Sequence, residues 1–261
     1  MHTLYSLEDA TVAWSLRYRL RVDVQFEAII FDIDGTLVDS VDLHAKAWQV
    51  AFDKFGKTVS FKAIRRQVGK GADQLVPVFF SKDELDQFGD ELNSYRSNLF
   101  KQEYLPTVKA FPKVRALFER IKQDGRQIAL ASSAKDDELE AYKKIARIAD
   151  LTEAETSSGD VKKSKPYPDV FATALKELGN ISPDQVIAVG DTPYDAEAAG
   201  KINLRVIGLL SGAWNEEDLR RAGCVAVYQD PADLLARYDS SPLAPLCRVS
   251  TSESHEERFE R

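Results

Sequence analysis

Short hydrophobic runs alternate along this chain with longer segments whose apolar positions recur every three or four residues. The short runs are typical of buried strands, and the periodic segments are typical of amphipathic helices. The predicted strands lie at 28–31, 127–131, 186–189, 205–209 and 224–227. The predicted helices lie at 114–123, 137–147, 169–178, 195–201, 216–221 and 232–237. This alternation predicts an α/β fold, a Rossmann-like parallel sheet with helices on both faces.

The segment between the first and second predicted strands breaks the alternation. From Val41 to about Thr107 its pattern is almost wholly helical, and one predicted apolar face carries Leu43, Ala47, Val50 and Ala51. We therefore expect a small α-helical cap domain inserted into the core. The predicted division is an N-terminal extension, a core in two pieces, a cap and a C-terminal tail, at 1–24, 25–41 with 108–239, 42–107, and 240–261.

The extension does not follow the strand and helix pattern of the rest. Residues 16–22 alternate apolar and basic side chains. An extra edge strand and a simple extension both fit this pattern. An edge strand would also allow pairing with another subunit, so both a monomer and a homodimer stay open.

Composition narrows the class of protein. The chain has 261 residues, of which 44% are hydrophobic, which suffices for one large domain or a core with an insertion. A net charge of −7 argues against a nucleic-acid or membrane-surface partner. We find neither a signal peptide nor an apolar run of the roughly 20 residues that span a bilayer. Cys224 and Cys247 lack metal-ligand spacing, so we expect reduced thiols in a cytoplasmic protein.

The first predicted strand ends in two acidic residues one position apart, Asp32 and Asp34, followed by Gly35. Alternation along a strand places both carboxylates on one side. Like charges so close are unfavourable unless a cation lies between them or one carries a proton. The pair therefore indicates a Mg²⁺ site with a nucleophilic carboxylate beside an acid/base carboxyl. A polar Asp-Gly turn is the alternative, whereas a calcium loop fails because Gly35 comes too early.

Three further motifs follow other predicted strands or lie close to their ends. Ser132 and Ser133 offer hydroxyl groups, and Lys165 precedes two prolines that stiffen its backbone. Asp191 ends a strand, and Asp195 follows one turn later. These residues suit phosphate binding and Mg²⁺ ligation, since Mg²⁺ prefers oxygen ligands. Taken singly, each has an ordinary alternative: a capping serine, a solvated lysine or a capping aspartate.

The order and spacing of these motifs resemble the haloacid dehalogenase (HAD) superfamily, in the branch with a helical cap that includes phosphoglycolate phosphatase and β-phosphoglucomutase. The resemblance covers roughly Phe26 to Tyr238. It implies that Asp32 attacks phosphorus to form an aspartyl-phosphate and that Asp34 is the general acid and base. It also implies phosphate contacts and metal ligands. The phosphate-binding residues would be Ser132, Ser133, Lys165 and Gly35, and the Mg²⁺ ligands Asp32, Asp34 through its backbone carbonyl, and Asp191, with Asp195 alongside.

The presence of Asp34 separates activities within this superfamily. Dehalogenases and phosphonatases lack an acid two residues after the nucleophile, so Asp34 argues against both. His44 falls where β-phosphoglucomutase carries a hinge histidine, and a partly buried helical histidine is the alternative. Gly190 stands before Asp191, where the mutase typically has a second acid, and this departure disfavours the mutase.

The cap is expected to select the substrate. Lys70 lies between Gly69 and Gly71, a pattern that suits a loop facing a ligand, although a turn with a solvated lysine also fits. We predict a Mg²⁺-dependent phosphatase for a small phosphorylated metabolite, either a sugar phosphate or a phosphoglycolate-like compound. The alternatives are a phosphomutase and, less favoured, a non-catalytic binding protein.

Overall fold

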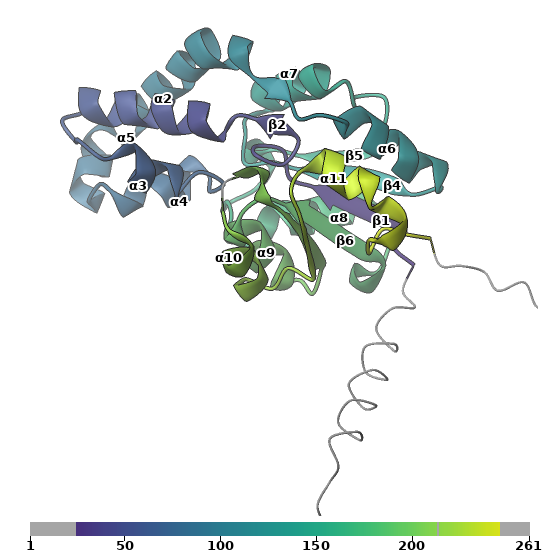
Figure 1. Cartoon of the computed structure of the whole chain (residues 1–261). Coiled ribbons are helices and arrows are strands. Elements are labelled where there is room, and N and C mark those ends of the chain that lie inside the picture. Colours follow the sequence, from purple (N-terminus) through teal and green to yellow (C-terminus); the bar gives the residue numbers. More distant parts are fainter. Residues whose placement is uncertain (1–24, 213, 246–261) are drawn as a thin grey trace, which may run out of the picture.

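A six-stranded parallel sheet forms the centre of the computed structural model, which describes residues 25–212 and 214–245 (Figure 1). Every adjacent pair of its strands is parallel. Across the sheet the strands run in the order β5 (Ala154–Thr156), β4 (Gln127–Ala131), β1 (Ala28–Phe31), β6 (Val186–Gly190), β7 (Arg205–Leu209) and β8 (Ala226–Tyr228). The predicted α/β fold is thus confirmed.

Alternate residues of the central strands build two separate hydrophobic layers. Ile29 and Phe31 belong to one buried cluster, while Ala28 and Ile30 belong to the other. Strand side chains point alternately to opposite faces, so a sheet that is apolar on both faces must be covered by helices on both. The first layer is covered by α6 (Val114–Gln123), α7 (Asp136–Ala146) and α11 (Pro231–Ala236), and the second by α8 (Asp169–Glu177), α9 (Pro193–Gly200) and α10 (Glu216–Arg221).

Between β1 and β4 the chain leaves the sheet and forms a group of helices, here called the cap, that lies to one side of the core (Figure 1). The cap has its own hydrophobic cluster, centred on Trp48, Phe52 and Phe80. Its elements are α2 (Val41–Lys54), α3 (Phe61–Arg65), α4 (Ala72–Leu75), a 3₁₀ turn (Val76–Val78) and α5 (Lys82–Leu99), followed by a π turn (Phe100–Tyr104) and a 3₁₀ turn (Leu105–Thr107). The exact domain boundaries given above stay predictions.

The apolar face predicted for α2 is partly wrong. Val50 is 40% exposed, although Ala47 and Ala51 are buried as expected. The stripe that packs into the cap instead carries Val41, Ala45, Trp48 and Phe52. These residues recur at intervals of three and four, and the large aromatic rings determine which face is buried.

Three short strands were not anticipated. β5 has only three residues and includes a glutamate, so its hydrophobic signal is weak. β2 (Val38–Asp39) and β3 (Lys109–Ala110) pair antiparallel where the chain enters and leaves the cap. β8 begins two residues later than predicted. In each case pairing with a neighbouring strand sets the bounds, and local composition does not reveal it.

The ends of the chain are described only in part. Residues 1–24 and 246–261 lie outside the described residues, and so do the suggested edge strand at 16–22 and Cys247. The beginning of the predicted tail is packed: Leu243 is fully buried in the core, and its carbonyl accepts a hydrogen bond from Arg126. Among described helices, none has the length and apolar character that crossing a membrane requires.

Candidate active site

The candidate site lies where the direction of the sheet topology reverses. From β1 the chain proceeds to β4 and β5 on one side, and then to β6, β7 and β8 on the other. Asp32 directly follows β1, Ser132 follows β4 and Asp191 follows β6. Parallel strands end at the same edge, and ligands bind at such reversal points in open α/β sheets. The topology therefore brings together residues more than 150 positions apart.

Three buried carboxylates form the centre of the site. Asp32, Asp191 and Asp195 each offer an oxygen within 4.8 Å of the others. One buried cation faces them: the Lys165 ammonium contacts Asp32, lies 2.8 Å from Asp195 Oδ1 and donates to the Ala131 carbonyl at 3.1 Å. One positive charge against three carboxylates leaves an excess of negative charge in a region shielded from water.

The excess of negative charge shifts the pKa values of these buried groups. Burial raises the pKa of Asp32 to about 7, with Asp195 and Asp34 adding to the effect and Lys165 opposing it. Burial and the charges of Asp32 and Asp195 raise the pKa of Asp191 well above its usual value. The pKa of Lys165 is raised because Asp195 and Asp32 outweigh its own burial. A cation among these oxygens would reverse the shifts of the acids.

The donor set fits a Mg²⁺ ion. Asp191 Oδ2 is buried without a hydrogen-bond partner among the described residues, although a buried acceptor is normally paired. Two glycines surround it: a Cβ atom would lie 2.3 Å from this oxygen at Gly35 and 1.7 Å from it at Gly212. The space beside the unpaired oxygen thus depends on two residues without side chains, and oxygen ligands are those that Mg²⁺ prefers.

Thr36 joins two of the carboxylates. Its hydroxyl lies 3.0 Å from Asp32 Oδ2 and 2.9 Å from Asp191 Oδ1, and the side chain is fully buried. A hydroxyl has one proton, so it donates to one acid at a time. Nothing local in the sequence reveals this contact of Thr36 with a residue 155 positions away.

Asp195 has two functions at once. It completes a capping box at the start of α9, where its Oδ2 accepts hydrogen bonds from the Thr192 amide at 3.0 Å and hydroxyl at 2.6 Å. Its other oxygen faces Lys165. The capping alternative is therefore correct for Asp195, and it fixes the carboxylate that pairs with the lysine.

Asp34 points away from the three carboxylates, toward the cap. Its carboxylate accepts from the Ser40 hydroxyl at 2.5 Å and lies 2.9 Å from His44 Nε2, which is 3.0 Å from the Tyr142 hydroxyl. Burial alone would raise the pKa of Asp34, but His44, Ser40 and Tyr142 together lower it to about 2. Asp34 is therefore ionised in this arrangement.

His44 is held from both sides by residues that the sequence did not single out. Its ring stacks on Phe100 with centroids 3.9 Å apart, and the Arg96 guanidinium donates to Nδ1. A donor at Nδ1 places the imidazole proton on Nε2, where it faces Asp34. His44 comes from α2, Arg96 from α5 and Tyr142 from α7, so cap and core meet at Asp34.

The two serines after β4 differ in their surroundings. Ser132 is fully buried, and its hydroxyl accepts a hydrogen bond from the Ala134 amide at 3.0 Å. Ser133 Oγ is buried without a hydrogen-bond partner among the described residues, and Ser133 lines the cleft beside Asp34. Both hydroxyls therefore keep a proton to donate, and that of Ser133 also lies in the wall of the cleft.

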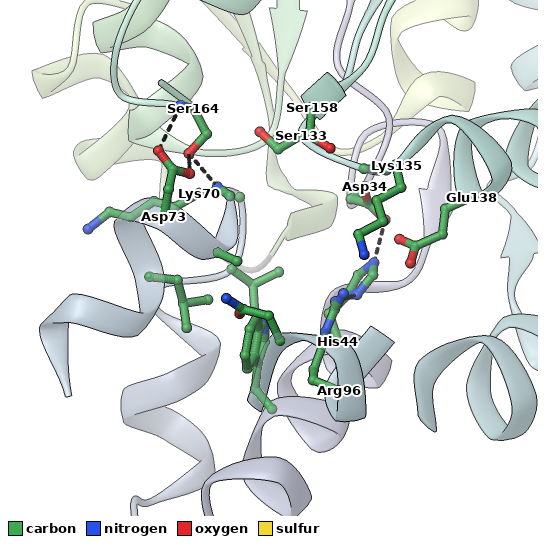
Figure 2. A pocket seen from close by; sticks show the side chains of 18 of the residues that line it. Asp34, His44, Lys70, Asp73, Arg96, Ser133, Lys135, Glu138, Ser158 and Ser164 are labelled. Atoms are coloured by element: carbon green, nitrogen blue, oxygen red, sulfur yellow. Dashed lines mark hydrogen bonds and ion pairs between the residues drawn. The ribbon is translucent and has the colours of Figure 1, made fainter. Parts of the chain in front are cut away.

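A cleft of about 400 Å³ lies between cap and core and has both Asp32 and Asp34 in its wall. Figure 2 shows Asp34 among the side chains that line it. Lys70 also lines it, but the side chain extends away from Asp34 and His44 in Figure 2. Its ammonium donates to Gln67 at 2.7 Å and lies 4.6 Å from the centre of the Tyr194 ring. Burial lowers the pKa of Lys70. A contact of Lys70 with substrate stays a prediction.

The loop that carries Lys70 is fastened to the core next to Lys165. The Gly71 amide donates to Ser164 Oγ at 2.9 Å, and the Ser164 hydroxyl donates to Asp73 at 2.5 Å. The Ser164 amide also donates to Asp73, at 3.1 Å. These bonds hold the cap over the cleft in the present arrangement.

Together the fold and the site define a capped α/β enzyme with its acidic centre at the strand ends. The chain belongs to the haloacid dehalogenase-like hydrolase family, whose model matches residues 29–209. A phosphorylated carbohydrates phosphatase of Thermotoga maritima is 28% identical over 80% of this chain and 96% of its own length. A phosphoglycolate phosphatase of Rhodospirillum rubrum is also 28% identical, over 80% of this chain and 89% of its own. The crystal structure of a hydrolase from Pseudomonas syringae superposes with a TM-score of 0.73 at 26% identity, covering 84% of this chain and 99% of that one.

Proposed function

We propose that this chain is a Mg²⁺-dependent phosphatase that hydrolyses a small phosphomonoester through a covalent intermediate on Asp32. The observation that carries the proposal is the buried group of Asp32, Asp191 and Asp195 with Lys165, placed at the reversal point of the sheet, with Asp32 in the wall of the capped cleft. The two named phosphatases support a phosphorylated metabolite as substrate, either a sugar phosphate or a phosphoglycolate-like compound.

Asp32 would act as the nucleophile. One of its oxygens forms a bond to phosphorus while the bond to the leaving oxygen breaks, and water then releases phosphate from the aspartyl-phosphate. Mg²⁺, held by Asp32, Asp191 and the backbone carbonyl of Asp34 with Asp195 alongside, would supply positive charge that offsets the charge of substrate and acids. Lys165 is fixed beside Asp32, so its ammonium meets the phosphoryl oxygens without reorganisation.

Asp34 would act as general base and acid. In the present arrangement it is ionised, which suits removal of a proton from the attacking water. To donate a proton to the leaving oxygen, Asp34 must first be protonated. The contacts from Ser40 and His44 must therefore loosen before that step, and both partners belong to the segment at the start of α2 that leads into the cap.

The test is phosphate release from a panel of phosphomonoesters with and without Mg²⁺, comparing the wild type with Asp32→Asn. We expect Mg²⁺-dependent release from the wild type and none from the variant, with an unchanged circular dichroism spectrum. Asp86→Asn is the matched control, because this aspartate is 65% exposed and is not among the residues that line the cleft. Release that persists in Asp32→Asn would remove the nucleophile assignment.

A phosphomutase is the second candidate, and the contact between His44 and Asp34 favours it. A histidine that holds the acid/base residue turned toward the cap, away from the nucleophile, can slow loss of the phosphoryl group to water. Interconversion of hexose phosphate isomers, without net release of phosphate, would identify a mutase. If the protein shows neither phosphate release nor isomer interconversion, the non-catalytic binding protein is the remaining alternative.

A cytoplasmic location and the oligomeric state stay predictions.

A further inference from the structure

Two helices, one from the core and one from the cap, present polar side chains to the cleft that Asp34 lines. Glu138 and Tyr142 are four residues apart on α7, so they lie on one helix face, and Tyr142 is the residue that contacts His44. Asn93 and Arg96 are three residues apart on α5 in the cap. Glu138, Asn93 and Arg96 all line the cleft. None of the family motifs in the sequence includes them.

Glu138 is the most unusual of these residues. It is only 2% exposed, and its Oε1 has no hydrogen-bond partner among the described residues. In Figure 2 its carboxylate points toward Lys135 and His44, on the wall of the cleft. A buried acceptor without a donor is costly, and a bound ligand that brings a donor removes this cost.

A second buried acceptor of this kind lies on the cap side of the cleft. Asn93 Oδ1 is also a buried acceptor that lacks a hydrogen-bond partner among the described residues. The Arg96 guanidinium is engaged in part: it donates to His44 and lies 4.9 Å from Trp48 and 5.1 Å from Phe100, measured to the ring centres, but its buried Nε has no hydrogen-bond partner among the described residues. Unused hydrogen-bonding capacity near Asp34 thus includes one acceptor from the core, and one acceptor and one donor from the cap.

We propose that Glu138 is a specificity-determining residue that selects phosphomonoesters bearing hydroxyl groups and disfavours those bearing a carboxylate. This inference rests on the proposed phosphatase function. The leaving oxygen must lie beside Asp34, so the remainder of the substrate extends into the part of the cleft that Glu138 lines. Hydroxyl groups donate to both unused acceptors, whereas a substrate carboxylate has no proton to donate and adds a like charge next to Glu138.

The cations around the cleft do not reverse this preference. Four lysine and arginine side chains line it: Lys70, Arg96, Lys135 and Lys162. Lys135 and Lys162 are exposed, so solvent and salt screen their charge, and Lys70 extends away from Asp34. Arg96 is linked to Asp34 through His44, and its remaining Nε–H can donate to a hydroxyl oxygen, so one hydroxyl group can pair with both Arg96 and Glu138. Glu138 is the most buried of the charged side chains on this part of the wall. Within the proposed class of small phosphomonoesters, the geometry accordingly points to sugar or polyol phosphates over phosphoglycolate-like compounds.

The experiment measures kcat/KM for glucose 6-phosphate, glycerol 3-phosphate and 2-phosphoglycolate in the wild type and in Glu138→Gln and Glu138→Lys. We expect the wild type to prefer the hydroxylated esters. A hydrogen bond to a charged group corresponds to about 10- to 100-fold in affinity, so the preference should fall by about that factor in Glu138→Gln. In Glu138→Lys it should invert in favour of 2-phosphoglycolate. Glu140→Gln is the matched control, since Glu140 lies on the same helix, is 52% exposed and pairs with Lys143.

The outcomes separate this inference from the proposed function. Thermal unfolding shows whether each variant is folded, and Glu138→Asp, which keeps the charge, should keep the direction of the wild-type preference. A wild type that hydrolyses p-nitrophenyl phosphate but prefers 2-phosphoglycolate overturns the role of Glu138 and leaves the phosphatase proposal intact. The same holds if folded Glu138→Gln or Glu138→Lys keeps the wild-type preference. A wild type that releases phosphate from no ester, p-nitrophenyl phosphate included, overturns both.

Discussion

Gly212 provides a stringent test of the metal site, because the site needs the absence of a side chain there. In Gly212→Ala the new Cβ would lie 1.7 Å from Asp191 Oδ2 and 2.5 Å from its Cγ, whereas ordinary contacts begin at 3.4 Å. Half the required separation is missing, so either Asp191 or the backbone after β7 must move by more than an ångström. Either movement displaces the Asp191 carboxylate from its position near Asp32.

We expect a loss of about 100-fold in kcat/KM, since displacements of about 1 Å at a reacting centre have effects of that size. Overpacking should also lower the free energy of unfolding by about 1–3 kcal/mol. The measurements are phosphate release at increasing Mg²⁺ concentration and urea unfolding. We also expect weaker Mg²⁺ binding, seen as a higher Mg²⁺ concentration for half-maximal activity.

The control is Gly200→Ala, the same chemical change at the end of α9, where a Cβ would meet nothing within 4 Å. Alanine favours a helix over glycine by about 1 kcal/mol, so this variant should be as stable as the wild type or slightly more so, with full activity. A Gly212→Ala protein with wild-type rates and Mg²⁺ response would refute the assignment of Asp191 as a metal ligand.

Three further predictions concern single buried groups. Thr36→Val removes the hydroxyl that bridges two carboxylates, and urea unfolding should show a loss of about 1–3 kcal/mol. The pKa of Asp34 is lowered from 3.8 to about 2, so its contribution to stability is complete above pH 3.8 and is lost as pH falls toward 2. The difference in unfolding free energy between wild type and Asp34→Asn should therefore shrink by about 2 kcal/mol over that range, and a constant difference would contradict the shift. Burial raises the pKa of Cys224 to about 12, so in a Cys247→Ser background a thiol reagent should label the native protein far more slowly than the unfolded one.

Hydrophobic pattern and motif position were enough to predict the architecture and the residues of the acidic centre. Strands β1, β4 and β7 have the predicted bounds, because short, fully apolar runs bounded by polar residues have few alternatives. Asp32 and Asp191 could be expected to meet because the ends of parallel strands meet at one edge of the sheet. β5 could not be found in this way, since its three residues form a strand only by pairing with β4.

What the sequence alone determined is therefore local: which segments are strands or helices, and which strand ends carry acids, hydroxyls and a lysine. Only the tertiary structure determined how these groups are paired and turned. It directs Asp34 to His44 and the cap, brings Thr36 between Asp32 and Asp191, and leaves Glu138 Oε1 without a hydrogen-bond partner in the part of the chain that the structure describes. The physical reason is that contacts between residues far apart in the chain depend on the packing of whole helices, and single side chains leave no trace of such packing in local periodicity.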